Sequence, residues 1–191
     1  MGFDTVYAFG SFEGALQKLI HLFKYSKVES LAKPLSELLL RALPRDGNFD
    51  LVMAMPMHWR KQWDRGFNQA ELLAGPVARR LGLKLSKNLR RSRYTQAQAG
   101  LDEAGRRANL KDSFRVKQPS AVAGKRVLLI DDVLTTGATL RTAAEALKQA
   151  GAARVTVLTL ARVDRHSGLG NSVLSPKVQP TRAVLAGTEA S

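Results

Sequence analysis

Residues 127–139 read VLLIDDVLTTGAT, and this stretch decides the fold. Its first four residues form a continuous apolar run that predicts a buried strand. Two adjacent carboxylates, Asp131 and Asp132, follow, and a loop of threonine and glycine then leads into an alanine-rich helix predicted at residues 139–150. A β-branched strand is predicted at residues 155–160. Strand, helix and strand within roughly 35 residues form a βαβ unit with a right-handed crossover.

The rest of the chain predicts further elements before this unit. They are a short strand or hairpin arm, two helices and a buried parallel strand, at residues 5–12, 15–24, 30–43 and 51–55. The helical pattern of residues 67–81 is interrupted by Gly75 and Pro76, so we expect a kink or two short helices there. Residues 84–118 are polar, basic and weakly periodic, which is typical of a functional or mobile loop.

Length and composition bound the class of protein. The 191 residues suit one α/β domain, predicted over residues 1–164 with a helical N-terminal part at 1–45, followed by a disordered tail at 165–191. The absence of cysteine excludes disulfides, a cysteine nucleophile and cysteine-ligated zinc. The sequence shows no apolar run of membrane-spanning length and no signal-peptide pattern, so we expect a cytoplasmic protein with no membrane partner.

Positive charge is concentrated in the middle of the chain. The formal net charge is +14, and residues 58–126 contain 17 basic and 5 acidic side chains. A field of this sign attracts polyanions, either nucleic acid or a polyphosphorylated metabolite. Composition does not distinguish between these two kinds of ligand.

The stretch at residues 127–139 combines groups that suit a phosphorylated sugar. The carboxyl ends of parallel strands are where α/β sheets bind ligands. The loop before the helix offers hydroxyls, backbone N–H groups and Gly137 to a phosphate. Asp131 and Asp132 would repel that phosphate unless they face ribose hydroxyls, or a magnesium ion shared with them. The alternative is a structural turn in which the carboxylates only cap the loop backbone.

These 13 residues resemble the ribose-phosphate binding signature of the type I phosphoribosyltransferases. The resemblance implies a type I phosphoribosyltransferase-like α/β fold: a twisted, mainly parallel sheet flanked by helices, with a small N-terminal helical hood. It also implies that Asp131 and Asp132 hold the ribose 2′- and 3′-hydroxyls of phosphoribosyl pyrophosphate (PRPP), with Mg²⁺ shared between them and the substrate. The PRPP-binding residues that it implies are Asp131, Asp132, Val133, Leu134, Thr135, Thr136, Gly137, Ala138 and Thr139, the last five around the 5-phosphate.

A second segment, residues 56–74, indicates a particular family within this fold. Residues 56–74 read PMHWRKQWDRGFNQAELLA and look like the signature of the ComF family of competence-associated, phosphoribosyltransferase-like proteins. Residues 93–114 and the helical region at 8–43 are also similar to that family, so the likeness spans about residues 5–162. Many ComF proteins begin with a four-cysteine zinc module. This chain has no cysteine, so no zinc site and no contact made by that module is carried over.

Other polar residues are assigned by the same resemblance or by charge. The loop after the strand at 51–55 would bind pyrophosphate through Met57, His58 and Arg65, although a lone loop histidine is more often an ordinary polar residue. Arg106 would bind pyrophosphate as its loop closes and excludes water, the alternative being a basic linker. The candidates for nucleic-acid binding are Arg60, Lys61, Arg90, Arg91, Arg93 and Arg107.

Two functions of different classes follow from the resemblance and the charge. The first is a magnesium-dependent phosphoribosyltransferase, a pentosyl glycosyltransferase in which Asp131, Asp132 and Arg106 are the catalytic residues, pyrophosphate leaves and the acceptor is unidentified. The second is a DNA-uptake protein of natural transformation that binds single-stranded DNA beside a competence helicase and keeps its PRPP site as a sensor. A salvage enzyme without a DNA role is a third alternative. Homodimers are usual for the fold that the chain resembles.

Overall fold

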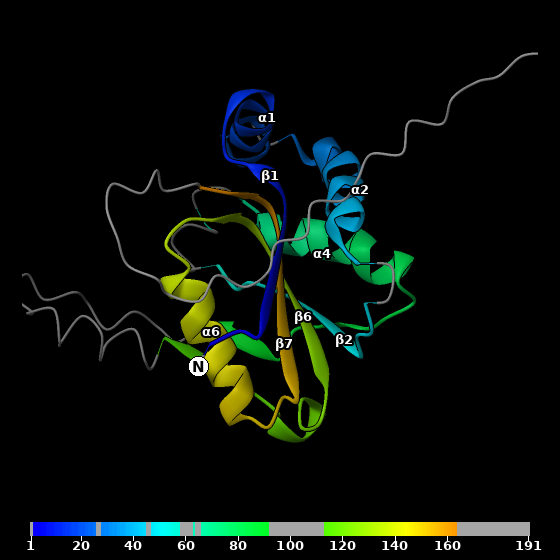
Figure 1. Ribbon diagram of the computed structural model, residues 1–191, viewed down its shortest axis with the longest axis vertical. Coiled ribbons are helices and arrows are strands. Elements are labelled where there is room, and N and C mark those ends of the chain that lie inside the picture. The colour runs from blue at the N-terminus through cyan, green and yellow to red at the C-terminus, as the bar shows by residue number, and fades with distance from the viewer. Residues whose placement is uncertain are drawn as a thin grey trace, which may run out of the picture.

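The centre of the molecule is a five-stranded sheet whose paired strands are all parallel (Figure 1). The computed structural model describes residues 2–25, 28–44, 47–57, 63, 66–91 and 113–163. The strand order across the sheet is β1-β7-β6-β2-β3, and β4 and β5 form a separate antiparallel ribbon. This is the mainly parallel α/β architecture that the sequence predicts.

The described elements have the following bounds. The strands are β1 Thr5–Ser11, β2 Leu51–Ala54, β3 Leu85–Ser86, β4 Leu89–Arg91, β5 Phe114–Val116, β6 Arg126–Leu134 and β7 Arg154–Arg162. The α-helices are α1 Gly14–Tyr25, α2 Ala32–Ala42, α4 Gln69–Arg80 and α6 Ala138–Gln149, and the 3₁₀ helices are η1 Glu29–Leu31 and η2 Pro119–Ala121.

The predicted βαβ unit is confirmed as β6, α6 and β7, and the predicted parallel strand at 51–55 is confirmed as β2. Strand β1 pairs in parallel with β7, from Thr5 beside Thr156 to Ser11 beside Arg162. The hairpin alternative for this segment is therefore wrong, because a hairpin arm would pair antiparallel with its neighbour along the chain.

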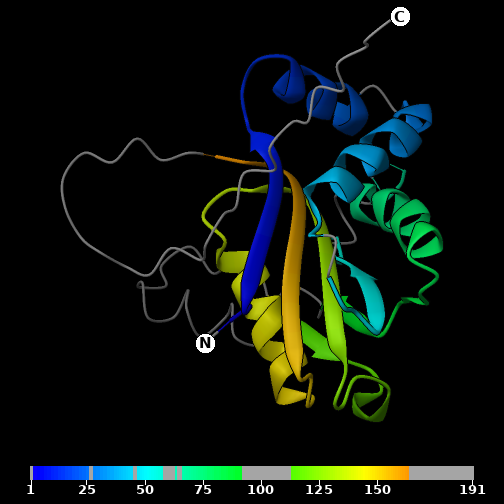
Figure 2. The ribbon, with the colours of Figure 1, turned by 45° about the vertical axis from the view of Figure 1, so that its right-hand side comes forward.

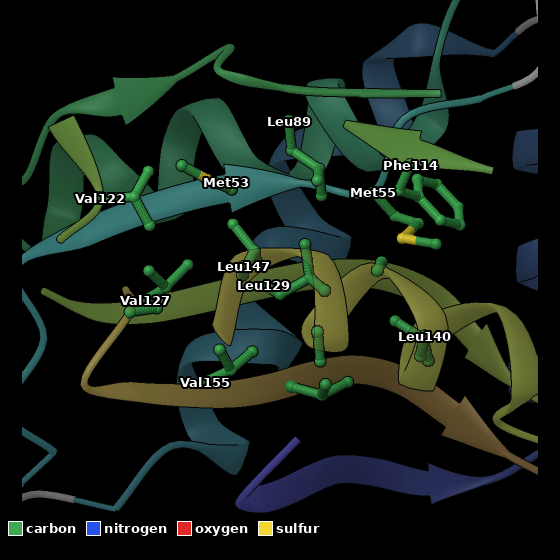
Figure 3. Packing of buried hydrophobic residues seen from close by; sticks show 14 of the residues in the cluster. Met53, Met55, Leu89, Phe114, Val122, Val127, Leu129, Leu140, Leu147 and Val155 are labelled. Atoms are coloured by element: carbon green, nitrogen blue, oxygen red, sulfur yellow. The ribbon is translucent and has the colours of Figure 1, made fainter. Parts of the chain in front are cut away.

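Helices cover both faces of the sheet (Figure 2). Helices α1, α2 and α4 pack on one face, where Leu128 and Ile130 of β6 are fully buried against them. Helix α6 and the β4–β5 ribbon pack on the other face, where Val127 and Leu129 are buried (Figure 3). Alternate residues of β6 thus point into two different cores, which explains why its apolar run is continuous.

Helix α4 is one continuous helix, although Gly75 and Pro76 lie within it. The expectation of two short helices is therefore wrong. Proline removes one backbone hydrogen bond in a helix interior and costs about 3 kcal/mol. Leu73 and Val77 are fully buried against α2 and the sheet, and this packing outweighs the local cost.

Part of the segment predicted as a loop at residues 84–118 is ordered structure. Strand β3 adds the last strand to the main sheet, and β4 pairs with β5 in antiparallel register. Leu89 and Phe114 of this ribbon are buried in the core on the α6 side (Figure 3). Two- and three-residue strands are too short to show a period in the sequence, so the polar composition concealed them.

The elements that form the sheet and its two helical layers lie between Thr5 and Arg162. The tail predicted at 165–191 lies outside the described residues. Within the described part of the chain, no helix has both the length and the apolar character needed to span a membrane.

Candidate functional site

A cavity of about 230 Å³ opens at the carboxyl ends of β2 and β6. From β2 the chain continues through α4 to β3, and from β6 it continues through α6 to β7 on the opposite side. The space between these two strand ends is a topological switch point, the position at which open α/β sheets bind ligands. The cavity therefore lies where the fold class places a binding site.

The acidic pair lies on β6 itself rather than in the loop after it. The strand continues through Leu134 and keeps its pairing with β7, with Asp131 beside Thr159 and Val133 beside Ala161. Both carboxylates line the cavity. The Asp131 Oδ1 atom accepts a hydrogen bond of 2.9 Å from the backbone N–H of Asp132. A strand fixes these carboxylates more firmly than a loop would.

The two carboxylates differ in their surroundings. Burial, and then the neighbouring charge of Asp132, raises the pKa of Asp131 to about 7. Asp132 instead forms an ion pair with Lys24 of α1, whose Nζ lies 3.0 Å from Asp132 Oδ2. The site thus holds one carboxyl group that resists ionisation and one that is paired with a cation.

The loop after β6 presents a helix N-terminus to the cavity. Gly137 is the N-cap of α6 with a φ of +73°, a conformation that favours glycine, and a Cβ there would approach Leu134 Cδ1 to 3.3 Å. The hydroxyl of Thr136 accepts a 3.3 Å hydrogen bond from the N–H of Ala138. Residues 135–140 all line the cavity, so the threonine hydroxyls and the N–H groups that follow Ala138 in the first turn of α6 are placed to meet an anion.

The opposite wall comes from β2 and the start of α4. Met55, Pro56 and Met57 line the cavity, and the buried Asn68 joins them to the helix. Asn68 donates a 3.1 Å hydrogen bond to the carbonyl of Met55 and accepts one from the N–H of Ala70. It is the N-cap of α4, and its side chain links the end of β2 to the start of this helix.

The predicted basic residues separate into three groups. Arg91 lines the cavity, and its guanidinium carbon lies 5.5 Å from the centre of the Phe114 ring. Arg90 is exposed on the other face of the ribbon, directly opposite the exposed Arg115. The other predicted residues lie outside the described part of the chain: His58, Arg60, Lys61, Arg65, Arg93, Arg106 and Arg107.

Sequence reasoning missed Lys24, Asn68 and Gln69, all of which line the cavity. Asn68 had a local signal, because an asparagine directly before a helical run is a favoured N-cap. Gln69 is 1% exposed and follows this cap. Lys24 had no signal, because its position depends on how α1 packs on the sheet.

The carboxylates of Asp131 and Asp132 could hold a metal ion only together with oxygen atoms of a bound ligand. Within the described residues, no group of three or more His, Asp or Glu side chains is arranged to hold a metal. Mg²⁺ is commonly bound by one or two carboxylates together with substrate phosphates. Asp131 and Asp132 fit that arrangement, and the described side chains do not form a complete metal site by themselves.

The comparisons with known proteins agree with this geometry. The phosphoribosyl transferase domain family matches residues 68–181. In fold, the chain is similar to the glutamine phosphoribosylpyrophosphate amidotransferase of B. subtilis, solved with ADP and GMP. The TM-score is 0.50 and the identity 24%, over 68% of this chain and 26% of that one. The molecule is thus a phosphoribosyltransferase-like protein with a type I fold.

Two relatives in sequence narrow the class further. The DNA utilization protein YhgH of Escherichia coli O157:H7 is 38% identical over 154 residues, which is 77% of this chain and 67% of the relative. Competence protein F of Haemophilus influenzae is 32% identical over 168 residues, which is 83% of this chain and 73% of the relative. The chain belongs to the ComF family.

Proposed function

We propose that this protein binds PRPP together with Mg²⁺ and transfers its phosphoribosyl group to an acceptor, with release of pyrophosphate. One observation supports this function above the others. An acidic pair on β6 and a hydroxyl-rich helix N-terminus line the same cavity at the switch point of a parallel sheet. These are the groups that a ribose diol and a phosphate monoester require.

In this proposal each wall of the cavity binds a different part of the substrate. The N–H groups and hydroxyls at residues 135–139 hold the 5-phosphate, and Asp131 and Asp132 accept hydrogen bonds from the ribose hydroxyls. The diphosphate then extends toward the end of β2 and the start of α4. Mg²⁺ held by the two carboxylates and the substrate would supply charge neutralisation for the diphosphate.

The transfer itself needs little chemistry from side chains. The bond between C1 of ribose and the pyrophosphate oxygen breaks, and pyrophosphate leaves with the electron pair. The acceptor forms the new bond to C1 and loses its proton to the solvent. The protein positions the substrate and stabilises charge. Arg106 remains a prediction for this step.

Calorimetric titration with PRPP and Mg²⁺ tests the proposal. The wild type is expected to bind, and the Asp131→Asn, Asp132→Asn double variant is expected to bind at least about 100-fold more weakly, because charge-assisted hydrogen bonds to the diol are lost. Release of pyrophosphate in the presence of different acceptors then tests turnover.

The double variant Glu29→Gln, Glu37→Gln is a matched control, because both side chains are exposed and the same two negative charges are removed. It should bind PRPP as the wild type does. Absence of PRPP binding by the wild type would contradict the proposed function. Equal binding by the two double variants would show that PRPP binds somewhere else.

The arginine pair on the ribbon supports a second candidate function, binding of single-stranded DNA. Arg90 and Arg115 lie directly opposite each other on exposed positions, and like charges in such a cross-strand pair destabilise a ribbon. A polyanion bound across the pair would remove this repulsion. The relatives named for DNA utilization and competence agree with such a ligand. A helicase partner and a homodimer remain predictions.

Binding of a labelled single-stranded oligonucleotide at several salt concentrations tests this second function. The Arg90→Gln, Arg115→Gln variant is expected to bind more weakly. The slope of its log binding constant against log salt concentration should be smaller in magnitude by about 1.4, because two phosphate contacts are lost. Arg79→Gln, Arg80→Gln at the exposed end of α4 is the control of equal charge. An equal effect of the two variants would show that only total charge matters.

A further inference from the structure

Lys24 reaches the cavity from the N-terminal helical layer. It lies in the last turn of α1, and its Nζ is 3.0 Å from Asp132 Oδ2. The side chains of Lys24 and Asp132 are 17% and 14% exposed, so most of this ion pair is enclosed. The backbone carbonyl of Lys24 accepts a 3.5 Å hydrogen bond from Nε2 of the buried Gln69. The residue is thus held by its main chain to α4 and by its ammonium to β6.

The ion pair lies on one particular side of the cavity. Leu128 and Ile130 of β6 face the layer of α1, α2 and α4, and Asp132 continues this alternation toward Lys24. Residues 135–139 lead into α6, which covers the opposite face of the sheet. Lys24 is therefore beside the start of α4, away from the helix N-terminus that suits the 5-phosphate.

The partner of Lys24 is a group that the ligand itself needs. The ammonium contacts Oδ2 of Asp132, and ribose hydroxyls that bind this carboxylate would compete with it. A lysine ammonium is a point charge on a flexible four-carbon stem, so it can turn from one anion to another nearby. Leaving it without any anion in this enclosed position would be costly. An anionic group of the ligand within reach of Lys24 would compensate the ammonium when the contact with Asp132 is broken.

We propose that Lys24 is an anion-binding residue of this cavity and holds the diphosphate of the bound ligand. Asp132 keeps the ammonium in position before the ligand arrives, and Lys24 turns to the diphosphate when Asp132 receives the ribose hydroxyls. This inference rests on the proposed function, because it assumes that PRPP occupies the cavity. It adds a residue of the N-terminal helical layer to the site.

Two ligands separate this assignment from a structural effect. PRPP carries the diphosphate, whereas ribose 5-phosphate offers the same hydroxyls and 5-phosphate without it. The Lys24→Met variant is expected to bind PRPP at least about tenfold more weakly, because one charge-assisted hydrogen bond is lost. Its affinity for ribose 5-phosphate is expected to change by less than about threefold, since Asp132 becomes free to accept the diol. Calorimetry in the presence of Mg²⁺ measures both affinities.

Two further variants serve as controls. Lys18→Met removes the same charge from an exposed position of α1 and should leave both affinities unchanged. Lys24→Arg keeps the charge and should retain most of the affinity for PRPP. Thermal unfolding establishes that each variant is folded.

The outcomes separate this inference from the proposed function. Equal weakening of both ligands by Lys24→Met, or no weakening of either, would overturn the inference alone, provided that the wild type binds both. A wild type that binds neither ligand would overturn the inference and the proposed function together. Selective loss of PRPP affinity that Lys24→Arg restores would support both.

Discussion

At the amino end of the sheet every described carboxylate is well paired, whereas at the carboxyl end two carboxylates lie side by side. Asp50 accepts hydrogen bonds of 2.7 and 2.9 Å from the Arg126 guanidinium and 2.8 Å from its backbone N–H. The side-chain hydrogen bond from Arg126 is the main cause that holds the pKa of Asp50 well below its usual value. Near the start of β1, burial opposes ionisation of Asp4, but hydrogen bonds from Lys148 and Val155 outweigh it and lower its pKa.

The carboxyl end reverses this arrangement. Burial and the charge of Asp132 raise the pKa of Asp131, and Asp132 relies on Lys24, which comes from another layer. Stability alone would favour a neutral side chain at Asp131, since this carboxylate is buried beside the charge of Asp132. Asp50 and Asp4 thus form contacts that stabilise the fold, and the contrast between the two ends agrees with the proposal that Asp131 and Asp132 bind a ligand.

Single substitutions at the two ends should therefore have opposite effects. Asp131→Asn is expected to weaken PRPP binding at least about tenfold while it maintains or raises the thermal midpoint at neutral pH, because a carboxylate that resists ionisation becomes neutral. Asp50→Asn is expected to lower the thermal midpoint, because the ion pair with Arg126 is lost. It should leave PRPP binding unchanged, because Asp50 lies at the opposite end of the sheet. Calorimetry and thermal unfolding measure the two properties.

Each of these variants is the control for the other, because each replaces one carboxyl side chain by an amide in a chain of net charge +14. A general effect of charge would shift both midpoints in the same direction. A fall of the midpoint in Asp131→Asn as large as that in Asp50→Asn would show that the acidic pair stabilises the fold, and the comparison between the two ends would fail.

The core of the fold and half of the site could be predicted because their signals are local. The apolar run before Asp131 marks β6, and the small residues around Gly137 mark the turn into α6. A strand, a turn and a helix in succession need only neighbouring residues to define them. The positions of the acidic pair and of the candidate phosphate-binding loop at residues 135–139 follow from this succession.

The rest depends on packing between distant segments. Helix α4 continues through Pro76 because Leu73, before the proline, and Val77, after it, are both fully buried. Local helix propensity does not reveal this burial. The ribbon exists because Leu89 and Phe114 reach the core from strands of three residues. Lys24 enters the cavity only after α1 has packed on the sheet, so its spacing along the chain indicates nothing about Asp132.

The pH dependence of stability gives a smaller but sharper test of the same comparison. The pKa of Asp131 is raised from 3.8 to about 7 in the folded protein, so folding takes up a proton at this residue between about pH 4 and pH 7. The contribution of Asp131 to the free energy of unfolding therefore falls as pH rises through that range and is constant above it. Asp50 has a lowered pKa and acts in the opposite sense, since its contribution is lost as pH falls below about 4.

Thermal unfolding of the wild type and Asp131→Asn across this range isolates the effect of Asp131. The two midpoints should be close near pH 4, where the carboxyl group is protonated in the folded protein and resembles the amide. The midpoint of Asp131→Asn should then exceed that of the wild type increasingly up to about pH 7, because only the wild type must take up a proton to fold. A difference that stays constant with pH would mean that Asp131 ionises normally in the fold. In that case, the acidic pair would impose no cost on folding, and the two ends of the sheet would differ only in the partners of their carboxylates.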